Sequence, residues 1–266
     1  MDLGLKGKTA VVLGGSKGIG YAIAKAFLQE GARVAICARK EEELKKAAEE
    51  LGALGEVYYE AMDVSKEQQV YDFADHVAAK FGTIDAWVNN VGITVFKEGD
   101  EFTDADIELI TGVTFKSAVF GGQAAFRYMK KQGGGAIVNI SSLAARCPTA
   151  GRSTLYGPMK AAIVNLTQTL AGEYAAYGVR VCCVMPGFTA TPAVKATIPQ
   201  AELDYNARGT LLNRVAEPKE IAAPVVFLCG QGASYMTGTT IEVSGGRSVT
   251  LNPTYSWDEK AKAEQA

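Results

Sequence analysis

Short apolar segments alternate with helix-forming segments along most of the chain, and this alternation constrains the fold more than any other feature. Parallel neighbouring strands need such helical crossovers. The strand segments are apolar throughout, as expected when helices cover both faces of a sheet. Seven strands are predicted: Thr9–Leu13, Arg33–Ala38, Val57–Ala61, Asp85–Asn89, Ala136–Ile140, Arg180–Met185 and Thr239–Val243. The sequence therefore predicts an α/β protein with a doubly wound, parallel, seven-stranded sheet.

The rest of the pattern indicates a single domain. No internal repeat and no linker rich in Pro, Gly or Ser divides the 266 residues, so we expect one domain over residues 1–250. Helical periodicity predicts helices over Tyr21–Glu30, Glu41–Leu51, Lys66–Phe81, Asp104–Lys131 and Tyr156–Tyr177. Two segments fall outside the rhythm. Phe188–Val215 is long, helical and polar, and Arg247–Ala266 is charged and includes a predicted C-terminal tail over residues 251–266.

Composition argues against several classes of partner. The formal net charge is −2, and no run of Lys or Arg is long enough to follow a phosphate backbone, so nucleic acid is not expected. The five cysteines are odd in number and form no CxxC pair, which favours buried free thiols in a reducing compartment. No cationic-then-apolar leader begins the sequence, and no apolar stretch approaches about 18 residues. We therefore expect a cytoplasmic protein with no membrane partner.

A glycine-rich turn, Leu13-Gly14-Gly15-Ser16-Lys17-Gly18-Ile19-Gly20, joins the first strand to the first helix. Its glycines let the backbone approach a pyrophosphate, whose charge the helix N-terminus meets. A plain tight turn contains similar glycines. The spacing is Gly-x-x-x-Gly-x-Gly, which resembles the turn of the short-chain dehydrogenase/reductase family within the Rossmann-type folds. Leu13 stands where that family usually has Thr, and the glycines are intact.

The end of the second strand indicates the cofactor. An NAD site places Asp or Glu there to accept hydrogen bonds from the ribose 2′-OH, but by the resemblance Ala38 occupies this position. Arg39, followed by Lys40, offers a planar fork of donors for a 2′-phosphate, and Lys17 offers a second charge. Arg39 and Lys17 as ordinary surface cations are the alternative. We predict NADP(H) in preference to NAD(H).

A phenol and an ammonium, Tyr156 and Lys160, lie four residues apart on one predicted helix face. A phenol with a pKa near 10 is a weak base at neutral pH, and a cation within about 6 Å lowers that pKa. Such pairs also occur by chance in helices. Here the pair opens the helix after the fifth strand, which ends Asn139-Ile140-Ser141-Ser142. In the family the second serine is catalytic, and Ser142 would stabilise charge on the substrate oxygen.

The resemblance covers about residues 5 to 247 and implies further site residues. It places Asp63 and Val64 at the adenine, and Asn90, in Asn89-Asn90-Val91-Gly92, behind the cofactor; an Asx-rich turn has the same residues. It places Pro186, Gly187, Thr189 and Thr191 at the nicotinamide. The family's fourth catalytic residue is an Asn that anchors a water leading to the lysine, and here that position is Thr114. Thr has a hydroxyl but lacks the amide's acceptor and two donors.

The implied function is an NADP(H)-dependent oxidoreductase that interconverts a secondary alcohol and a ketone. Phe188–Val215 is expected to cover an apolar, medium-sized substrate such as a hydroxysteroid, a cyclic alcohol or a 3-oxoacyl thioester, although an amphipathic helix pair packed on the core has the same composition. The alternative is a regulatory dinucleotide-binding protein that has lost turnover, which Thr114 and Leu13 favour. His76 is the only histidine, so no zinc site or Ser-His-Asp site is expected.

The family is commonly tetrameric or dimeric, built on the two long helices and the last strand. Both helices carry small residues on faces that we expect not to be needed for the sheet: Ala118, Gly121 and Ala125 on one, and Ala161, Ala171 and Ala175 on the other. Small residues let helices of two subunits approach closely, and they are equally common against a sheet. We therefore expect a homotetramer, with a homodimer as the alternative.

Overall fold

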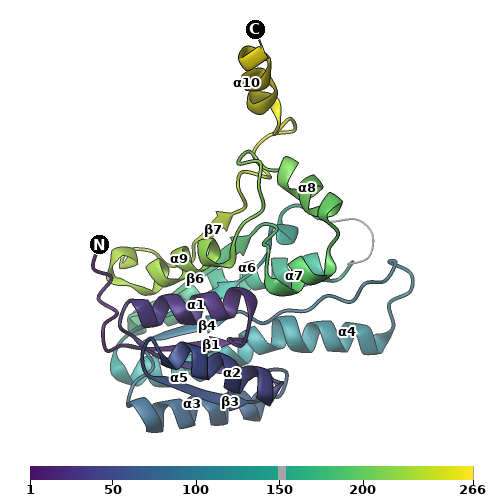
Figure 1. Cartoon of the computed structure of the whole chain (residues 1–266). Helices are drawn as coiled ribbons and strands as arrows, with labels where there is room; N and C mark the ends of the chain where they lie inside the picture. The colour runs from purple at the N-terminus through teal and green to yellow at the C-terminus, as the bar shows by residue number, and fades with distance from the viewer. Residues whose placement is uncertain (149–153, 266) are drawn as a thin grey trace.

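Seven parallel strands form one sheet in the computed structural model, which describes residues 1–148 and 154–265. Their order is β3-β2-β1-β4-β5-β6-β7 (Figure 1). The strands are β1 Thr9–Leu13, β2 Arg33–Ala38, β3 Val57–Ala61, β4 Ala86–Asn89, β5 Gly135–Ile140, β6 Val179–Pro186 and β7 Thr240–Val243. Each predicted strand is present with ends within one residue of those predicted. The predicted doubly wound sheet is confirmed.

Helices cover both faces of the sheet and bury two apolar layers. The α-helices are α1 Gly18–Gln29, α2 Glu41–Gly52, α3 Glu67–Phe81, α4 Asp104–Ile110, α5 Ser117–Gln132, α6 Tyr156–Tyr174, α7 Pro192–Thr197, α8 Gln200–Arg208, α9 Pro218–Cys229 and α10 Tyr255–Gln265. Helices α1, α2 and α9 pack on one face, and α3, α5 and α6 pack on the other. Strands enclosed in this way are buried on both sides, which explains their continuous apolar runs. The edge strand β3 is an exception, with a half-exposed pattern that includes Glu60.

Two sequence expectations about the long helices are wrong. The predicted helix Asp104–Lys131 is three elements, because a π-helical segment, Thr111–Lys116, separates α4 from α5. The small residues Ala118, Gly121 and Ala125 are buried on the sheet side instead of facing outward. A Cβ on Gly121 would lie 2.0 Å from Asn89 Oδ1, so this glycine lets α5 approach β4.

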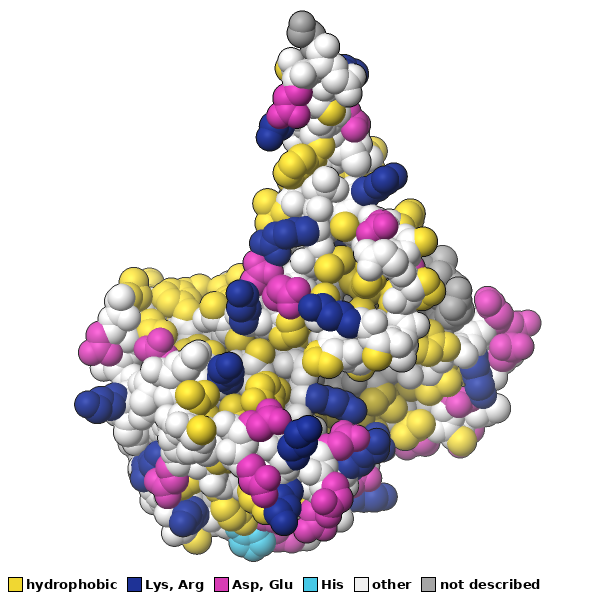
Figure 2. Space-filling view, in the orientation of Figure 1, with side chains coloured by type: hydrophobic (Ala, Val, Ile, Leu, Met, Phe, Trp, Pro, Cys, Tyr) yellow, Lys and Arg dark blue, Asp and Glu magenta, His cyan; other side chains and the backbone are white. Residues whose placement is uncertain are grey.

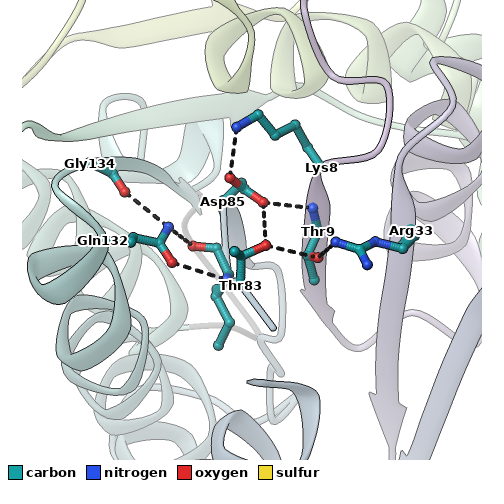
Figure 3. A network of polar contacts seen from close by, with 8 residues as sticks. Lys8, Thr9, Arg33, Thr83, Asp85, Gln132 and Gly134 are labelled. Atoms are coloured by element: carbon teal, nitrogen blue, oxygen red, sulfur yellow. Dashed lines mark hydrogen bonds and ion pairs between the residues drawn. The ribbon is translucent and has the colours of Figure 1, made fainter. Parts of the chain in front are cut away.

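Asp85 ties together the amino end of the sheet, opposite the end where ligands bind in such folds. Its carboxylate accepts hydrogen bonds from Lys8 Nζ (3.0 Å), the Thr9 backbone N–H (2.9 Å) and the Thr83 hydroxyl (2.9 Å) (Figure 3). Arg33 Nη2 donates to the Thr9 hydroxyl (3.0 Å) and so joins β2 to the same network. This network holds β1, β2 and β4 in register at the end remote from the candidate site.

The segments after β6 and β7 project beyond the sheet. The predicted cover, Phe188–Val215, contains the short helices α7 and α8, and the C-terminal tail forms α10, which extends away from the body (Figure 1). None of the residues from Tyr255 to Gln265 is buried. Trp257 Nε1 donates to the Leu211 carbonyl (2.9 Å) and links the tail to the segment that follows α8.

Candidate active site

The glycine turn has a backbone that other residues would strain. Gly14 and Gly18 have φ of +77° and +60°, in the left-handed region that favours glycine. A Cβ on Gly20 would lie 2.1 Å from the Gly14 carbonyl oxygen. Asn90 Nδ2 donates to the carbonyls of Leu13 (3.3 Å) and Gly14 (3.2 Å), which fixes the turn against the end of β4. The turn is therefore a preformed cradle of backbone groups.

The N-terminus of α1 is suited to a phosphate. Lys17 occupies the N-cap position, its side chain makes no capping hydrogen bond, and the first turn of the helix contains no acidic residue. The first N–H groups of a helix lack partners within it and carry a partial positive charge. A dinucleotide pyrophosphate satisfies both needs, so the residues present fit this group.

A cleft extends from this turn across the carboxyl ends of β1, β2 and β4, where the strand order reverses. Eight residues predicted to bind the cofactor line it: Gly14, Ser16, Lys17, Arg39, Lys40, Asp63, Val64 and Asn90. Asp63 Oδ1 accepts hydrogen bonds from the Ser65 N–H (3.0 Å) and hydroxyl (2.8 Å), which orients the carboxylate. Sequence reasoning missed other lining residues, among them Glu43, Met62, Ile93 and Val113.

The cations at the far end of the cleft surround Glu43. Lys40 Nζ lies 2.8 Å from Glu43 Oε1, and Lys17 Nζ lies 3.4 Å from Glu43 Oε2. The hydrogen bond from Lys40, with a smaller contribution from Lys17, lowers the pKa of the Glu43 carboxyl. Ala38 carries no acid, as the sequence showed, but this carboxylate from the first turn of α2 lies among the predicted phosphate ligands. Glu43 lies beyond the strand-end position at which an NAD site carries its acid.

Tyr156 and Lys160 both lie on the first turns of α6, as predicted. Lys160 is 2% exposed, its Nζ donates to the Ile140 carbonyl (2.8 Å), and the same atom lies 5.7 Å from the centre of the Tyr156 ring. A Cβ on Gly92 would lie 2.7 Å from Lys160 Nζ. Because Gly92 lines the cleft, the ammonium group borders the cofactor site.

Burial changes the protonation of this pair. It lowers the pKa of Lys160 to about 8 and raises the pKa of Tyr156, whereas a hydrogen bond with Ser142 lowers the latter. Ser142 follows β5, and its Oγ also accepts the Ala144 N–H (3.2 Å). At neutral pH the chain therefore holds a charged Lys160 beside a protonated phenol that is in contact with Ser142.

Thr114 lies inside the π-helical segment and is fully buried. Its hydroxyl accepts the Ile93 N–H (3.2 Å) and donates to the Ile93 carbonyl (3.4 Å). These bonds join the widened helix to the segment that follows Gly92. The Thr114 hydroxyl therefore bonds to the backbone of Ile93 and not to Lys160 itself. Ile93 is the neighbour of Gly92, which borders Lys160 Nζ.

The Pro-Gly segment after β6 closes the site from the other side. A Cβ on Gly187 would lie 2.8 Å from Ser244 Cα, so only glycine fits without a shift. Thr189 donates to the Gly187 carbonyl (3.0 Å), and Thr191 caps α7. A Cβ on Gly18 would lie 3.3 Å from Thr191 Cγ2, which places this segment directly against the glycine turn. The structure thus brings together the motifs that follow β1 and β6.

The remaining ionisable residues lie apart from this arrangement. His76 is on α3, where its Nδ1 lies 2.9 Å from Glu60 Oε2. All five cysteines are free, but Cys147 is exposed and Cys229 half-buried, so the prediction of buried thiols is wrong for these two. Within residues 1–148 and 154–265, no cluster of His, Cys, Asp or Glu could hold a metal ion. None of the helices in these ranges has both the length and the apolarity needed to span a membrane.

Comparisons with known proteins agree with this geometry. The family model described as enoyl-(acyl carrier protein) reductase matches residues 14–248. A 3-oxoacyl-(acyl-carrier-protein) reductase of Chlamydia pneumoniae is 35% identical over 92% of this chain and 99% of its own length. A tropinone reductase homolog of Arabidopsis thaliana is 38% identical over 92% of this chain and 95% of its own length.

A solved structure gives the same result. The crystal structure of L-sorbose reductase from Gluconobacter frateurii, complexed with NADPH and L-sorbose, is 32% identical to this chain with a TM-score of 0.88. The match covers 94% of this chain and 100% of the reductase. The motifs, the sheet order and these relatives agree throughout: this chain belongs to the short-chain dehydrogenase/reductase family and is an oxidoreductase by family.

Proposed function

We propose that this chain uses NADP(H) to interconvert a ketone and a secondary alcohol. The observation that carries the proposal is the position of Lys160, whose buried ammonium contacts Gly92 at the cofactor cleft and lies beside the Tyr156 ring. Burying a charged lysine costs free energy, and perturbed ionisable groups of this kind cluster at functional sites. Lys160 also adjoins the phenol that family members use as acid and base. Ser142 completes the group.

Each side chain has a defined task in ketone reduction. When bound in the cleft, NADPH would supply the hydride for the carbonyl carbon. Ser142 donates a hydrogen bond to the carbonyl oxygen, and Tyr156 transfers its phenolic proton to that oxygen as negative charge develops there. The positive charge of Lys160 stabilises the phenolate as it forms. Alcohol oxidation reverses these steps, with Tyr156 as the base.

The cofactor site supports NADP(H). Lys17, Arg39 and Lys40 surround the place of a 2′-phosphate, and Ala38 offers no acceptor for a ribose hydroxyl. The L-sorbose reductase relative is complexed with NADPH. The remaining contacts are assigned to Gly14, Ser16, Gly18, Ile19, Gly20, Asp63, Val64, Asn90, Tyr156, Lys160, Pro186, Gly187, Thr189 and Thr191. We expect NADPH to bind at least about tenfold more tightly than NADH.

The substrate is assigned to the space under Phe188–Val215, whose helices α7 and α8 follow the Pro-Gly segment. The named relatives reduce a sugar ketone or a 3-oxoacyl group, and both are ketones. A carbonyl flanked by a medium-sized carbon chain or ring is therefore the substrate class that we propose. Thr114 is assigned a positioning role, because its hydroxyl contacts the backbone of Ile93.

A substrate screen tests the function. NADPH oxidation is followed with L-sorbose, a 3-oxoacyl thioester, a bicyclic ketone and, to test the chemistry named by the family model, an enoyl thioester. Turnover of a ketone with the double bond of the enoyl thioester left intact supports the proposal. Turnover of the enoyl thioester alone would contradict the proposal and indicate that this protein reduces a carbon–carbon double bond instead of a carbonyl group. Tight NADPH binding without turnover of any carbonyl would favour the regulatory alternative.

A further inference from the structure

Glu43 lies among the cations that a 2′-phosphate would contact. Its two carboxylate oxygens are divided between two lysines, Lys40 on Oε1 and Lys17 on Oε2. One lysine comes from the glycine turn and the other from the end of β2, so the carboxylate bridges two separate elements of the cleft. The Glu43 side chain is 41% exposed, which leaves it room to turn away.

A 2′-phosphate and this carboxylate seek the same donors. A phosphate monoester carries between one and two negative charges near neutral pH and accepts hydrogen bonds from Lys and Arg. Lys17, Arg39 and Lys40 supply three positive charges, and Glu43 cancels one of them. With both anions present, the carboxylate repels the phosphate and each lysine bonds to only one of them at full strength. Phosphate binding is therefore weakened by Glu43, through repulsion where Glu43 stays beside its lysines or through the loss of its ion pairs where it turns away.

We propose that Glu43 is a specificity-determining residue that competes with the cofactor's 2′-phosphate for Lys17 and Lys40. This inference rests on the proposed use of NADP(H). Glu43 weakens NADPH binding and leaves NADH binding unchanged, so the chain's preference for NADPH is smaller than its three cations would give. The ion pairs are exposed, and exposed pairs are weak, so the effect is a few-fold.

A different role for Glu43 would be to accept a hydrogen bond from the 2′-OH of NADH, as an acid at the strand end does. The structure favours competition. Both oxygens of Glu43 are engaged by ammonium groups, and the residue stands in the first turn of α2, past the end of β2 at Ala38. The two roles predict opposite effects on NADH affinity.

Glu43→Gln is compared with Glu42→Gln in the full-length protein. Glu42 is an exposed neighbour in the same helical turn and is not among the described residues that line the cleft. Both substitutions remove one charge from the same helix end, so general electrostatic effects are matched. Dissociation constants for NADPH and NADH are measured by fluorescence titration at low and high salt.

We expect Glu43→Gln to tighten NADPH binding about threefold to fivefold and to change NADH binding less than twofold. Glu42→Gln should change either constant less than twofold. The gain should shrink at high salt, because screening weakens exposed charges within a Debye length of about 10 Å at 0.1 M. Glu43→Gln acting like Glu42→Gln on NADPH would overturn the proposal. Weaker NADH binding by Glu43→Gln would also overturn it and make Glu43 a ribose acceptor.

The same titrations separate this inference from the cofactor assignment. The preference for NADPH over NADH is measured in the unchanged protein, whereas the role of Glu43 is measured as a difference between variants. An unchanged protein that prefers NADH would contradict the assigned cofactor. If Glu43→Gln still tightened NADPH alone in that case, the competition would stand.

Discussion

Lys160 and Tyr156 lie on one helix, and burial shifts their pKa values in opposite directions. Burial disfavours the charged form of both groups, so it lowers the pKa of Lys160 to about 8 and raises that of Tyr156. Lys160 Nζ donates a hydrogen bond to the Ile140 carbonyl. At neutral pH the phenol is therefore in the protonated form that ketone reduction needs.

Replacing the phenol tests the assigned acid. Tyr156→Phe keeps the ring and removes the transferable proton, so we expect turnover to fall by about a hundredfold or more, with NADPH affinity nearly unchanged. Steady-state kinetics and a cofactor titration measure the two effects. Tyr235→Phe, at a fully exposed tyrosine, serves as the control. A Tyr156→Phe protein with unchanged turnover would rule out this mechanism.

The pKa of Lys160 also predicts how stability depends on pH. Between about 8 and the ordinary value of 10.5, the folded chain releases a proton that the unfolded chain keeps. The contribution of Lys160 to the free energy of unfolding is therefore unfavourable below about pH 8 and becomes less so as the pH rises through this window. We expect Lys160→Met to raise the free energy of unfolding at pH 7 by up to about 3 kcal/mol.

This gain should diminish toward pH 10, and urea unfolding of both proteins at several pH values measures it. The difference between the two proteins is the informative quantity. Burial raises the pKa of the Cys37 thiol to about 12, so ionisation of this group lowers the free energy of unfolding as the pH rises above 9, equally in both proteins. A difference that stays constant from pH 7 to pH 10 would show that Lys160 keeps its charge throughout.

Most of the candidate site could be predicted from single residues, and Glu43 shows why one of its charged groups could not. Gly14, Ser142, Tyr156 and Lys160 follow strands or open helices, where fixed spacing determines their position. Glu43 belongs to the site only because its side chain reaches Lys17 and Lys40 across the cleft. Side-chain reach of this kind leaves no spacing in the sequence.

At the scale of elements, the π-helical segment Thr111–Lys116 is the clearest departure from the predicted helix. Its apolar periodicity continues through both flanking helices, so the sequence pattern shows no break. The widened turn is stabilised by a tertiary contact, the pair of hydrogen bonds between Thr114 and Ile93. Such insertions often occur at functional sites, and this one adjoins the backbone beside Gly92.

Thr114→Val tests this contact, because it keeps the shape and removes the hydroxyl. The half-buried backbone of Ile93 would lose both partners, at a cost of roughly 1 kcal/mol of unfolding free energy. Turnover should also fall, since Gly92 next to Ile93 packs against Lys160. Thr114→Ser keeps the hydroxyl and should restore both properties. An unchanged pH–rate profile in Thr114→Val would restrict Thr114 to a structural role.

At the scale of the whole molecule, the alternation of strands and helices predicts the sheet and its cleft. It does not predict how charged and apolar side chains are distributed over the surface. Acidic and basic side chains are interspersed over the visible face, in keeping with the small net charge (Figure 2). Exposed apolar side chains occur near the C-terminal projection, among them Val249, Leu251 and Tyr255. None of the 11 residues of α10 is buried, so packing against the rest of the chain contributes little to the stability of this helix. An isolated helix of this length is only marginally stable in water.

The small residues of α5 do not support the predicted homotetramer. Ala118, Gly121 and Ala125 pack toward the sheet, so they cannot line a contact between subunits. The exposed surface of α4 instead offers Ile107 and Leu109, which are 41% and 46% exposed, and such apolar side chains are suited to subunit contacts.

We expect light scattering at micromolar concentration to give a mass four times the chain mass of 28.1 kDa. Ile107→Glu should lower that mass if α4 lies in the interface, because burying an unpaired carboxylate is costly. A mass of one chain for the unchanged protein would contradict both the tetramer and the dimer.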